Sequence, residues 1–149
     1  MTAYCTLSDV QALIKGFTID ENASVTPEEV TDDIIPEVSR QIDERLGMYY
    51  VTPITGTNAL LTLNRISRWM AAAEVADRVF LGQAPSESSQ SKTWRDLAEA
   101  DLTRVEKGQI LLTDAVATDD TPEAISRLIS DKLSSPTSGR PKFSMGMKF

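Results

Sequence analysis

The sequence predicts an all-α domain, a small bundle of about four to five helices with a long central helix and an extended C-terminal arm. Two observations support this fold class. Apolar residues recur at helical spacing through most of the chain, and the periodic segments lie between helix-start signals and glycine stops. The 149 residues amount to about one domain. Their composition, 41% apolar and 25% charged, is typical of a globular protein.

The first helix is predicted to begin after Thr6, an N-cap residue followed by Asp9 in the favourable first turn. Gly16 marks its end, and the polar stretch 17–25 is interpreted as a loop. The apolar face of this helix carries Leu7, Val10, Leu13 and Ile14.

A second start signal lies at Thr26, followed by a proline at the first helical position and a glutamate where a capping box places one. Gly47 ends the apolar run, whose members at helical spacing are Val30, Ile34, Ile35, Val38, Ile42 and Leu46. Pro36 lies inside this run, where a proline costs about 3 kcal/mol. We therefore expect a break or kink near Asp32 and Asp33, with Asp33 as a new N-cap and Pro36 in a new first turn.

The longest helix is predicted over residues 58–81, after a connector at 48–56, and is closed by Gly82. The alanines at 71–73 and Ala76 would allow another helix to approach closely. Its predicted inner stripe is Leu60, Leu63, Ile66, Met70 and Ala73, flanked by Trp69, Ala76 and Phe80. A further helix over 92–107, stopped by Gly108, turns inward Trp94, Leu97, Ala98, Leu102 and Val105.

The remaining part of the helical domain, which is expected to span residues 1–133, is short. The apolar run 110–112 predicts either a brief strand or a buried turn. A start signal at Thr121 then introduces a last short helix with the apolar residues Ala124, Ile125, Leu128, Ile129 and Leu133.

The residue types that most catalytic sites require are scarce. The chain has no histidine and a single cysteine, Cys5, which excludes Ser-His-Asp and Cys-His catalysis, Cys/His zinc sites and internal disulfides. It also contains no phosphate-binding P-loop, no GxGxxG motif and no GxSxG elbow. We therefore predict a protein that is not an enzyme and that needs no cofactor or metal. Cys5, Trp69 and Trp94 are interpreted as core residues.

Paired acidic residues are the remaining candidates for chemistry, and they occur at Glu28-Glu29, Asp32-Asp33, Asp43-Glu44 and Asp119-Asp120. Such pairs can supply metal ligands or a general acid and base. Acidic residues also stabilise helix N-termini, and most of these pairs lie at or near predicted helix starts. The second interpretation is preferred.

Charge divides the chain into two regions. The 15 basic and 22 acidic residues give a net charge of −7. Residues 134–149 contain three basic residues and no acidic one, which leaves −10 on residues 1–133. A nucleic-acid-binding domain usually has a basic surplus, so specific DNA binding by the helical body is not expected. No uncharged apolar run approaches the roughly 18 residues of a membrane span, and no membrane contact is predicted.

Residues 134–149 are interpreted as an extended C-terminal interaction tail. Their Pro, Gly and Ser content would also suit a solubilising terminus. Apolar residues nevertheless alternate with small or charged ones from Phe143 to Phe149, which suits a strand added to a partner's sheet edge or laid in a groove. The interaction arm is preferred, with Phe143 and Phe149 as anchors. The predicted partner-binding residues are Arg140, Pro141, Lys142, Phe143, Met145, Met147, Lys148 and Phe149.

Several segments also follow one another in a recognisable order. The segment YCTLSDVQALI is followed by VTPEEV, by an amphipathic helix ending in IDERLGMYYVTPI, by an alanine-rich helix and by a W…L…VEKGQILL segment. This order, over roughly residues 4–113, resembles the head–tail adaptor (connector, or head-completion) proteins of tailed bacteriophages.

The resemblance implies a structural virion protein that assembles as a ring of about twelve copies below the portal of the capsid. The implied partners are the portal protein and a tail-side stopper or tail terminator protein. Genomic DNA would pass through the ring without sequence-specific binding, and an acidic channel wall would repel its phosphates. The implied location is the head–tail junction of the virion, with the host cytoplasm during assembly. Residues 134–149 would then dock onto an adjoining component, with the portal as the first expectation.

Two other functions remain open. A tail-completion or stopper protein would form a ring further down and would contain more strand. A small helical regulatory module that binds a protein partner would stay monomeric or dimeric. An enzyme would need a pocket with convergent polar groups.

Overall fold

The computed structural model describes residues 2–80 and 89–118, of which 63% are helical and none lies in a strand. The predicted all-α fold class is therefore confirmed. The elements are α1 (Leu7–Leu13), α2 (Pro27–Glu29), the π-helical turn η1 (Val30–Ile34), α3 (Ile35–Leu46), α4 (Thr57–Phe80) and α5 (Ser89–Glu106). Because α2, η1 and α3 follow one another without a gap, the bundle has four helical rods in its described part.

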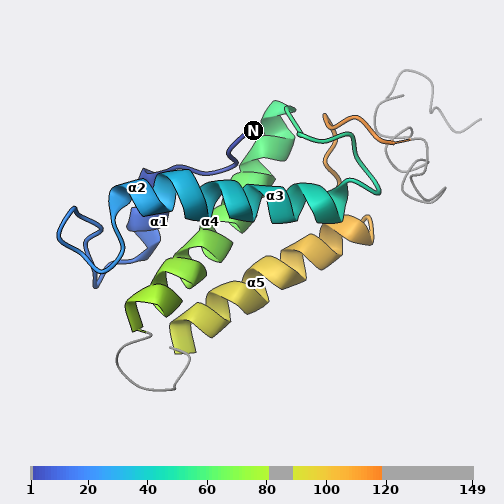
Figure 1. The fold of residues 1–149 in the computed structure, drawn as a ribbon. Coiled ribbons are helices and arrows are strands. Elements are labelled where there is room, and N and C mark those ends of the chain that lie inside the picture. Colours follow the sequence, from blue (N-terminus) through green and yellow to red (C-terminus); the bar gives the residue numbers. More distant parts are fainter. Residues whose placement is uncertain (1, 81–88, 119–149) are drawn as a thin grey trace, which may run out of the picture.

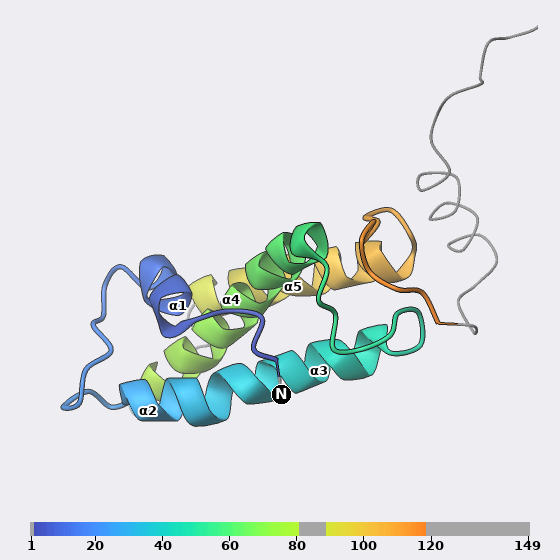
Figure 2. The same cartoon turned by 90° about the horizontal axis from the view of Figure 1, so that it is seen from above.

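The long helices α4 and α5 run antiparallel beside each other, and the α2–η1–α3 rod lies across them (Figures 1 and 2). Helix α1 packs against α4, which therefore contacts α1, α3, η1 and α5. No described helix is long and apolar enough to cross a bilayer. The last helix predicted from Thr121 and the tail 134–149 lie outside the described residues.

Local capping signals predict the first helix starts correctly. Thr6 forms a capping box with Asp9, in which the Asp9 amide donates to Thr6 Oγ1 over 3.3 Å and the Thr6 amide donates to Asp9 Oδ2 over 2.9 Å. The Thr26 hydroxyl likewise accepts from the Glu29 amide at 3.2 Å. Both caps satisfy helix N–H groups that would otherwise lack a partner.

The break or kink predicted near Asp32 and Asp33 takes the form of the π-helical turn η1, within a chain that stays helical from residue 27 to 46. Pro36 lies in the first turn of α3 as predicted, whereas the predicted N-cap role of Asp33 is wrong. The structure accommodates Pro36 with the π-turn η1, in which the Ile35 amide donates to the Val30 carbonyl five residues back. The wider turn replaces the carbonyl arrangement that a proline ring would clash with in a regular helix. Asp33 caps nothing; its carboxylate instead accepts from the Arg78 guanidinium at 2.9 Å.

The buried face of α4 is broader than predicted, and most of its buried residues lie in the stretch 71–76. Leu63 and Ile66 are fully buried as expected, whereas Leu60, Trp69 and Met70 are only half-buried and Phe80 is exposed. Ala71, Ala72 and Ala73 are all fully buried. Three consecutive helical residues cover more than half of the helix circumference, so α4 is enclosed by neighbours on most sides at this level. The predicted close approach at these alanines is consistent with this packing.

Helix α5 starts at Ser89, earlier than predicted, and ends just before Gly108, which has the positive φ of 69° expected of a glycine stop. Trp94, Ala98, Leu102 and Val105 are buried as predicted. Leu97 is 43% exposed, contrary to the prediction, and Asp101 occupies the inner face in its place. The Asp101 carboxylate can be buried because Arg65 and Arg104 bind it at 2.9 and 3.2 Å.

The segment after α5 fixes both ends of the connector between α3 and α4. The apolar run 110–112 forms no strand, and Leu112 is buried in an irregular turn, which is the second of the two predicted alternatives. The Asp114 carboxylate accepts from the Asn58 and Ala59 amides at 2.6 and 2.8 Å, which caps α4 from far along the chain. Gly56 is needed at this contact because a Cβ there would lie 2.5 Å from the Asp114 carboxyl carbon.

Candidate interaction surfaces

The predicted partner-binding residues, from Arg140 to Phe149, all lie outside the described residues. What the structure does place is the body to which this tail is attached. Its chain leaves the described region beside the connector, where the Thr118 amide donates to the Tyr49 carbonyl at 3.0 Å. The Thr118 hydroxyl also donates to the Met48 carbonyl at 3.0 Å. The described chain therefore ends, at Thr118, at the end of the bundle where α3 ends.

A connector patch of exposed apolar side chains lies at this same end. Met48, Val51 and Val116 are 70%, 52% and 68% exposed. They come from two segments that are joined by the Val51 amide, which donates to the Val116 carbonyl at 2.7 Å, and by a bridge between Tyr50 and Ala117. Scattered apolar residues are normal on a surface, but neighbouring ones are typical of a contact site.

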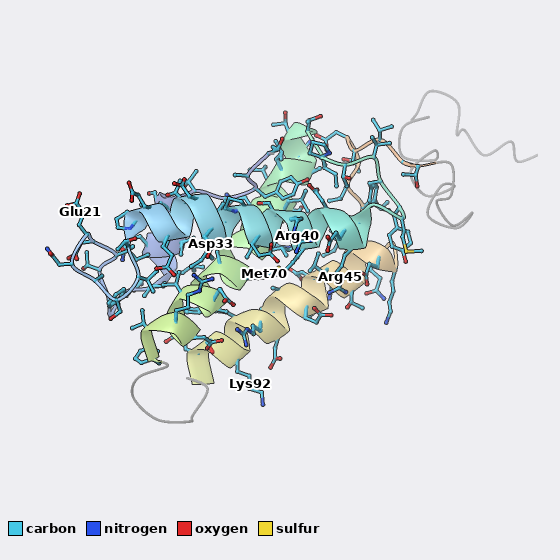
Figure 3. The ribbon with its side chains drawn as sticks, viewed as in Figure 1. Glu21, Asp33, Arg40, Arg45, Met70 and Lys92 are labelled. Atoms are coloured by element: carbon cyan, nitrogen blue, oxygen red, sulfur yellow. The ribbon has the colours of Figure 1, made fainter. Side chains whose placement is uncertain are left out.

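A polar-rimmed groove of about 530 Å³ runs between α3, α4 and α5. Figure 3 labels Met70 of α4 in the opening between α3 and α5. Apolar side chains from all three helices form its floor: Ile34 and Val38, Met70, and Ala98. The rim is charged, and its carboxylates outnumber its guanidinium groups; the charged residues are Glu37, Glu74, Asp96, Glu99, Arg78 and Arg95.

Arginine clamps hold the two ends of this groove. At one end Arg78 of α4 binds Glu29 and, at 2.9 Å, Asp33 of the crossing rod. At the other end Arg45 of α3 binds Glu99 at 2.6 Å and Glu106 at 2.9 Å on α5. These pairs connect the three helices, and hydrogen bonding to its carboxylate partners raises the pKa of Arg45.

The clamps also show what the paired acids do. Glu29 and Asp33 share Arg78, Glu44 binds Arg40, and Asp43 accepts from the Tyr4 hydroxyl. The fourth pair, Asp119-Asp120, lies outside the described residues. Within residues 2–80 and 89–118 no three Cys, Asp or Glu side chains are grouped as metal ligands would be. Of these pairs, Glu29, Asp33 and Glu44 are ion-pair partners of arginines, and Asp43 is a hydrogen-bond acceptor.

Of the three residues predicted to lie in the core, Cys5 and Trp94 are buried and Trp69 is only half-buried. Cys5 is buried, accepts from the Ser67 hydroxyl at 3.1 Å, and burial raises the pKa of its thiol. Trp94 is buried, whereas Trp69 is half-buried beneath the Arg65 guanidinium, 5.8 Å from its ring centre. Tyr4 is also buried, and burial followed by the hydrogen bond to Asp43 raises its pKa.

A second cavity of about 560 Å³ lies where the end of α1 meets α4 and α5. Its walls are mainly apolar, with Phe17, Val79, Phe80 and Trp94 as the large side chains and Lys15 as the charged one. Residues 81–88, which join α4 to α5 at this end, lie outside the described residues.

Sequence reasoning found neither the groove nor the connector patch. The groove acids Asp96 and Glu99 lie in the middle of α5, away from any helix start, and this was the available signal. Nothing in the sequence marked Val116 as part of a surface patch, because a single valine in a polar stretch is unremarkable on its own. Comparisons of this chain with protein-family models and with curated proteins find no match.

Proposed function

We propose that this protein is a non-enzymatic structural subunit of a phage head–tail junction, which assembles as a ring between the portal and the tail-side proteins. The observation that carries the proposal is the connector patch. Met48, Val51 and Val116 expose large apolar side chains at the end of the bundle from which the chain continues toward the basic tail. An exposed patch of this kind is suited to contact with another protein.

The architecture of the body supports the same proposal. Ion pairs of Arg45 and Arg78 join the long helices to one another, which suits a subunit that packs beside identical copies. The absence of strands among residues 2–80 and 89–118 favours an adaptor over a stopper ring, for which more strand is expected. The sequence resemblance over residues 4–113 points to the same class.

Charge is consistent with DNA passage through such a ring. Residues 1–133 carry a net charge of −10, and the described cations are largely engaged by carboxylates, as Arg45, Arg78 and Arg95 illustrate. A channel wall made from this body would present few free cations to hold DNA phosphates. DNA would therefore slide past it without a sequence-specific contact.

Native mass spectrometry of the chain, alone and mixed with the portal protein encoded beside it, tests the proposal. The expected result is a discrete complex with many copies of this chain for each portal ring, which is lost when residues 134–149 are removed. A chain that ignores the portal and stays a monomer or dimer would contradict the ring proposal and would favour a regulatory module. Circular dichroism of the shortened chain controls for loss of folding.

A further inference from the structure

We propose that the groove between α3, α4 and α5 receives the C-terminal residues 140–149 of a second copy of this chain. The inference deepens the proposed function and rests on it, because it names the contact that joins neighbouring subunits in the ring. Under this proposal the tail's partner is a neighbouring copy of this chain and not the portal. Three properties support it: charge, shape and reach.

The charges of groove and tail are opposite. The groove rim has four carboxylates and two guanidinium groups. Arg78 and Arg95 already bind acidic residues, while Glu37 and Glu99 bind Arg40 and Arg45 beside the groove. Asp96 and Glu37 are exposed on opposite walls, on α5 and α3. The tail carries Arg140, Lys142 and Lys148 and no acid. Complementary charge of this kind guides association and selects the partner.

The shape of the groove suits an extended segment with apolar anchors. Its floor is apolar, and a volume of about 530 Å³ lies within the range of pockets that enclose a small ligand or a few side chains. The alternation from Phe143 to Phe149 directs apolar side chains to one side of an extended chain and small or charged ones to the other. Phe143 would therefore enter the groove while Lys142 and Lys148 face the rim.

The chain is long enough to reach a neighbour. Between Thr118 and Phe143, a helix over the predicted 121–133 contributes about 20 Å and extended residues contribute about 35 Å. The sum exceeds the diameter of a small domain, which is roughly 30 Å, so the tail can reach across to a neighbouring copy. A groove and a tail are unlike surfaces, and a contact between unlike surfaces on identical subunits closes into a ring when the rotation allows.

Peptide binding tests the groove directly. The receptor is the full chain carrying Arg140→Ser, Lys142→Ser and Phe143→Ser, so that its own tail is neutral there and competes weakly with either form of the groove, and the probe is a fluorescent peptide of residues 134–149. Adding Glu37→Lys and Asp96→Lys to the receptor should raise the peptide Kd at least about tenfold. The same receptor with Glu21→Lys and Glu28→Lys, two exposed acids outside the groove lining, is the matched control and should bind as before.

A charge-reversed peptide completes the design. The Arg140→Glu, Lys142→Glu peptide should bind the groove-reversed receptor better than it binds the original one. If the control with Glu21→Lys and Glu28→Lys lost as much binding as the groove-reversed receptor, net charge alone would explain the loss, and the proposal would be overturned. Failure of the peptide to bind any receptor would overturn it as well, and a chain that still forms a ring with the portal would leave the proposed function standing.

Mixing two full-length variants distinguishes a second copy from the chain's own tail. One variant carries the groove reversals and a natural tail; the other carries a natural groove and the tail changes Arg140→Ser, Lys142→Ser and Phe143→Ser, which are not complementary to the reversed groove. Each has one working surface, so native mass spectrometry of the mixture should show a one-to-one heterodimer and nothing larger. A mixture that stays monomeric while the peptide still binds would place the tail in its own groove and overturn the exchange between copies.

Discussion

Large apolar side chains are buried in the α4–α5 seam, where these two helices pack together, and are exposed at the connector end. In the seam, Leu102 and Val105 of α5 are fully buried in the core that also holds Ala71 and Ala72 of α4. At the connector end, Met48 and Val116 leave more than half of their side chains in water. The seam is therefore a finished part of the fold, whereas the connector patch has apolar surface left for another molecule.

The largest expected effect lies in the seam. Leu102→Ala should lower the free energy of unfolding by about 2–5 kcal/mol, because a fully buried leucine is lost and a cavity remains. Leu97→Ala is the matched control, since it removes the same atoms from the same helix at a side chain that is 43% exposed. Urea unfolding followed by circular dichroism measures both. Equal losses for the two variants would contradict the described phase of α5.

A smaller effect, sensitive to pH, is expected where the segment after α5 caps α4. Local desolvation raises the pKa of the exposed Asp114 carboxyl, but hydrogen bonds from the Asn58 and Ala59 amides outweigh it, and the net pKa is lowered. A lowered pKa in the folded state stabilises the fold above the ordinary pKa of 3.8, and this stability is lost as the pH falls through the folded value.

The variant Asp114→Asn removes this titration. Its stability should fall less than that of the natural chain between pH 5 and pH 2.5, a window that covers roughly the titration of a carboxyl with a lowered pKa. Thermal unfolding at several pH values measures the difference. Parallel pH profiles for the two proteins would show that Asp114 does not hold the helix start.

The smallest effect on stability is expected at the connector patch. Val51→Ser with Val116→Ser should change the free energy of unfolding by less than about 0.5 kcal/mol for each site, because both side chains are mostly in water. Assembly should nevertheless weaken, which sedimentation velocity in the presence of the portal would detect. Unchanged assembly together with unchanged stability would show that the patch makes no contact in the ring.

Local signals in the sequence predicted most of the fold. Thr6 and Thr26 cap their helices through neighbours three residues away, and Gly108 ends α5 through its own backbone conformation. Such features depend on adjacent residues, so a single sequence contains them. The same holds for the buried stripe of α5 apart from Leu97.

Contacts between distant segments could not be predicted in the same way. The burial of Asp101 against Arg65 and the cap that Asp114 provides to α4 both depend on residues brought together by tertiary packing. The groove is of the same kind, since its walls come from three helices. The tail was singled out by composition, and its role stays a prediction.

Electron microscopy of the portal protein mixed with this chain tests the central claim most directly. The ring proposal predicts an additional ring of density beneath the portal, built from copies of this helical bundle with their connector patches at an interface. Portal particles that look the same with and without the chain, while the chain itself sediments as a monomer, would contradict it.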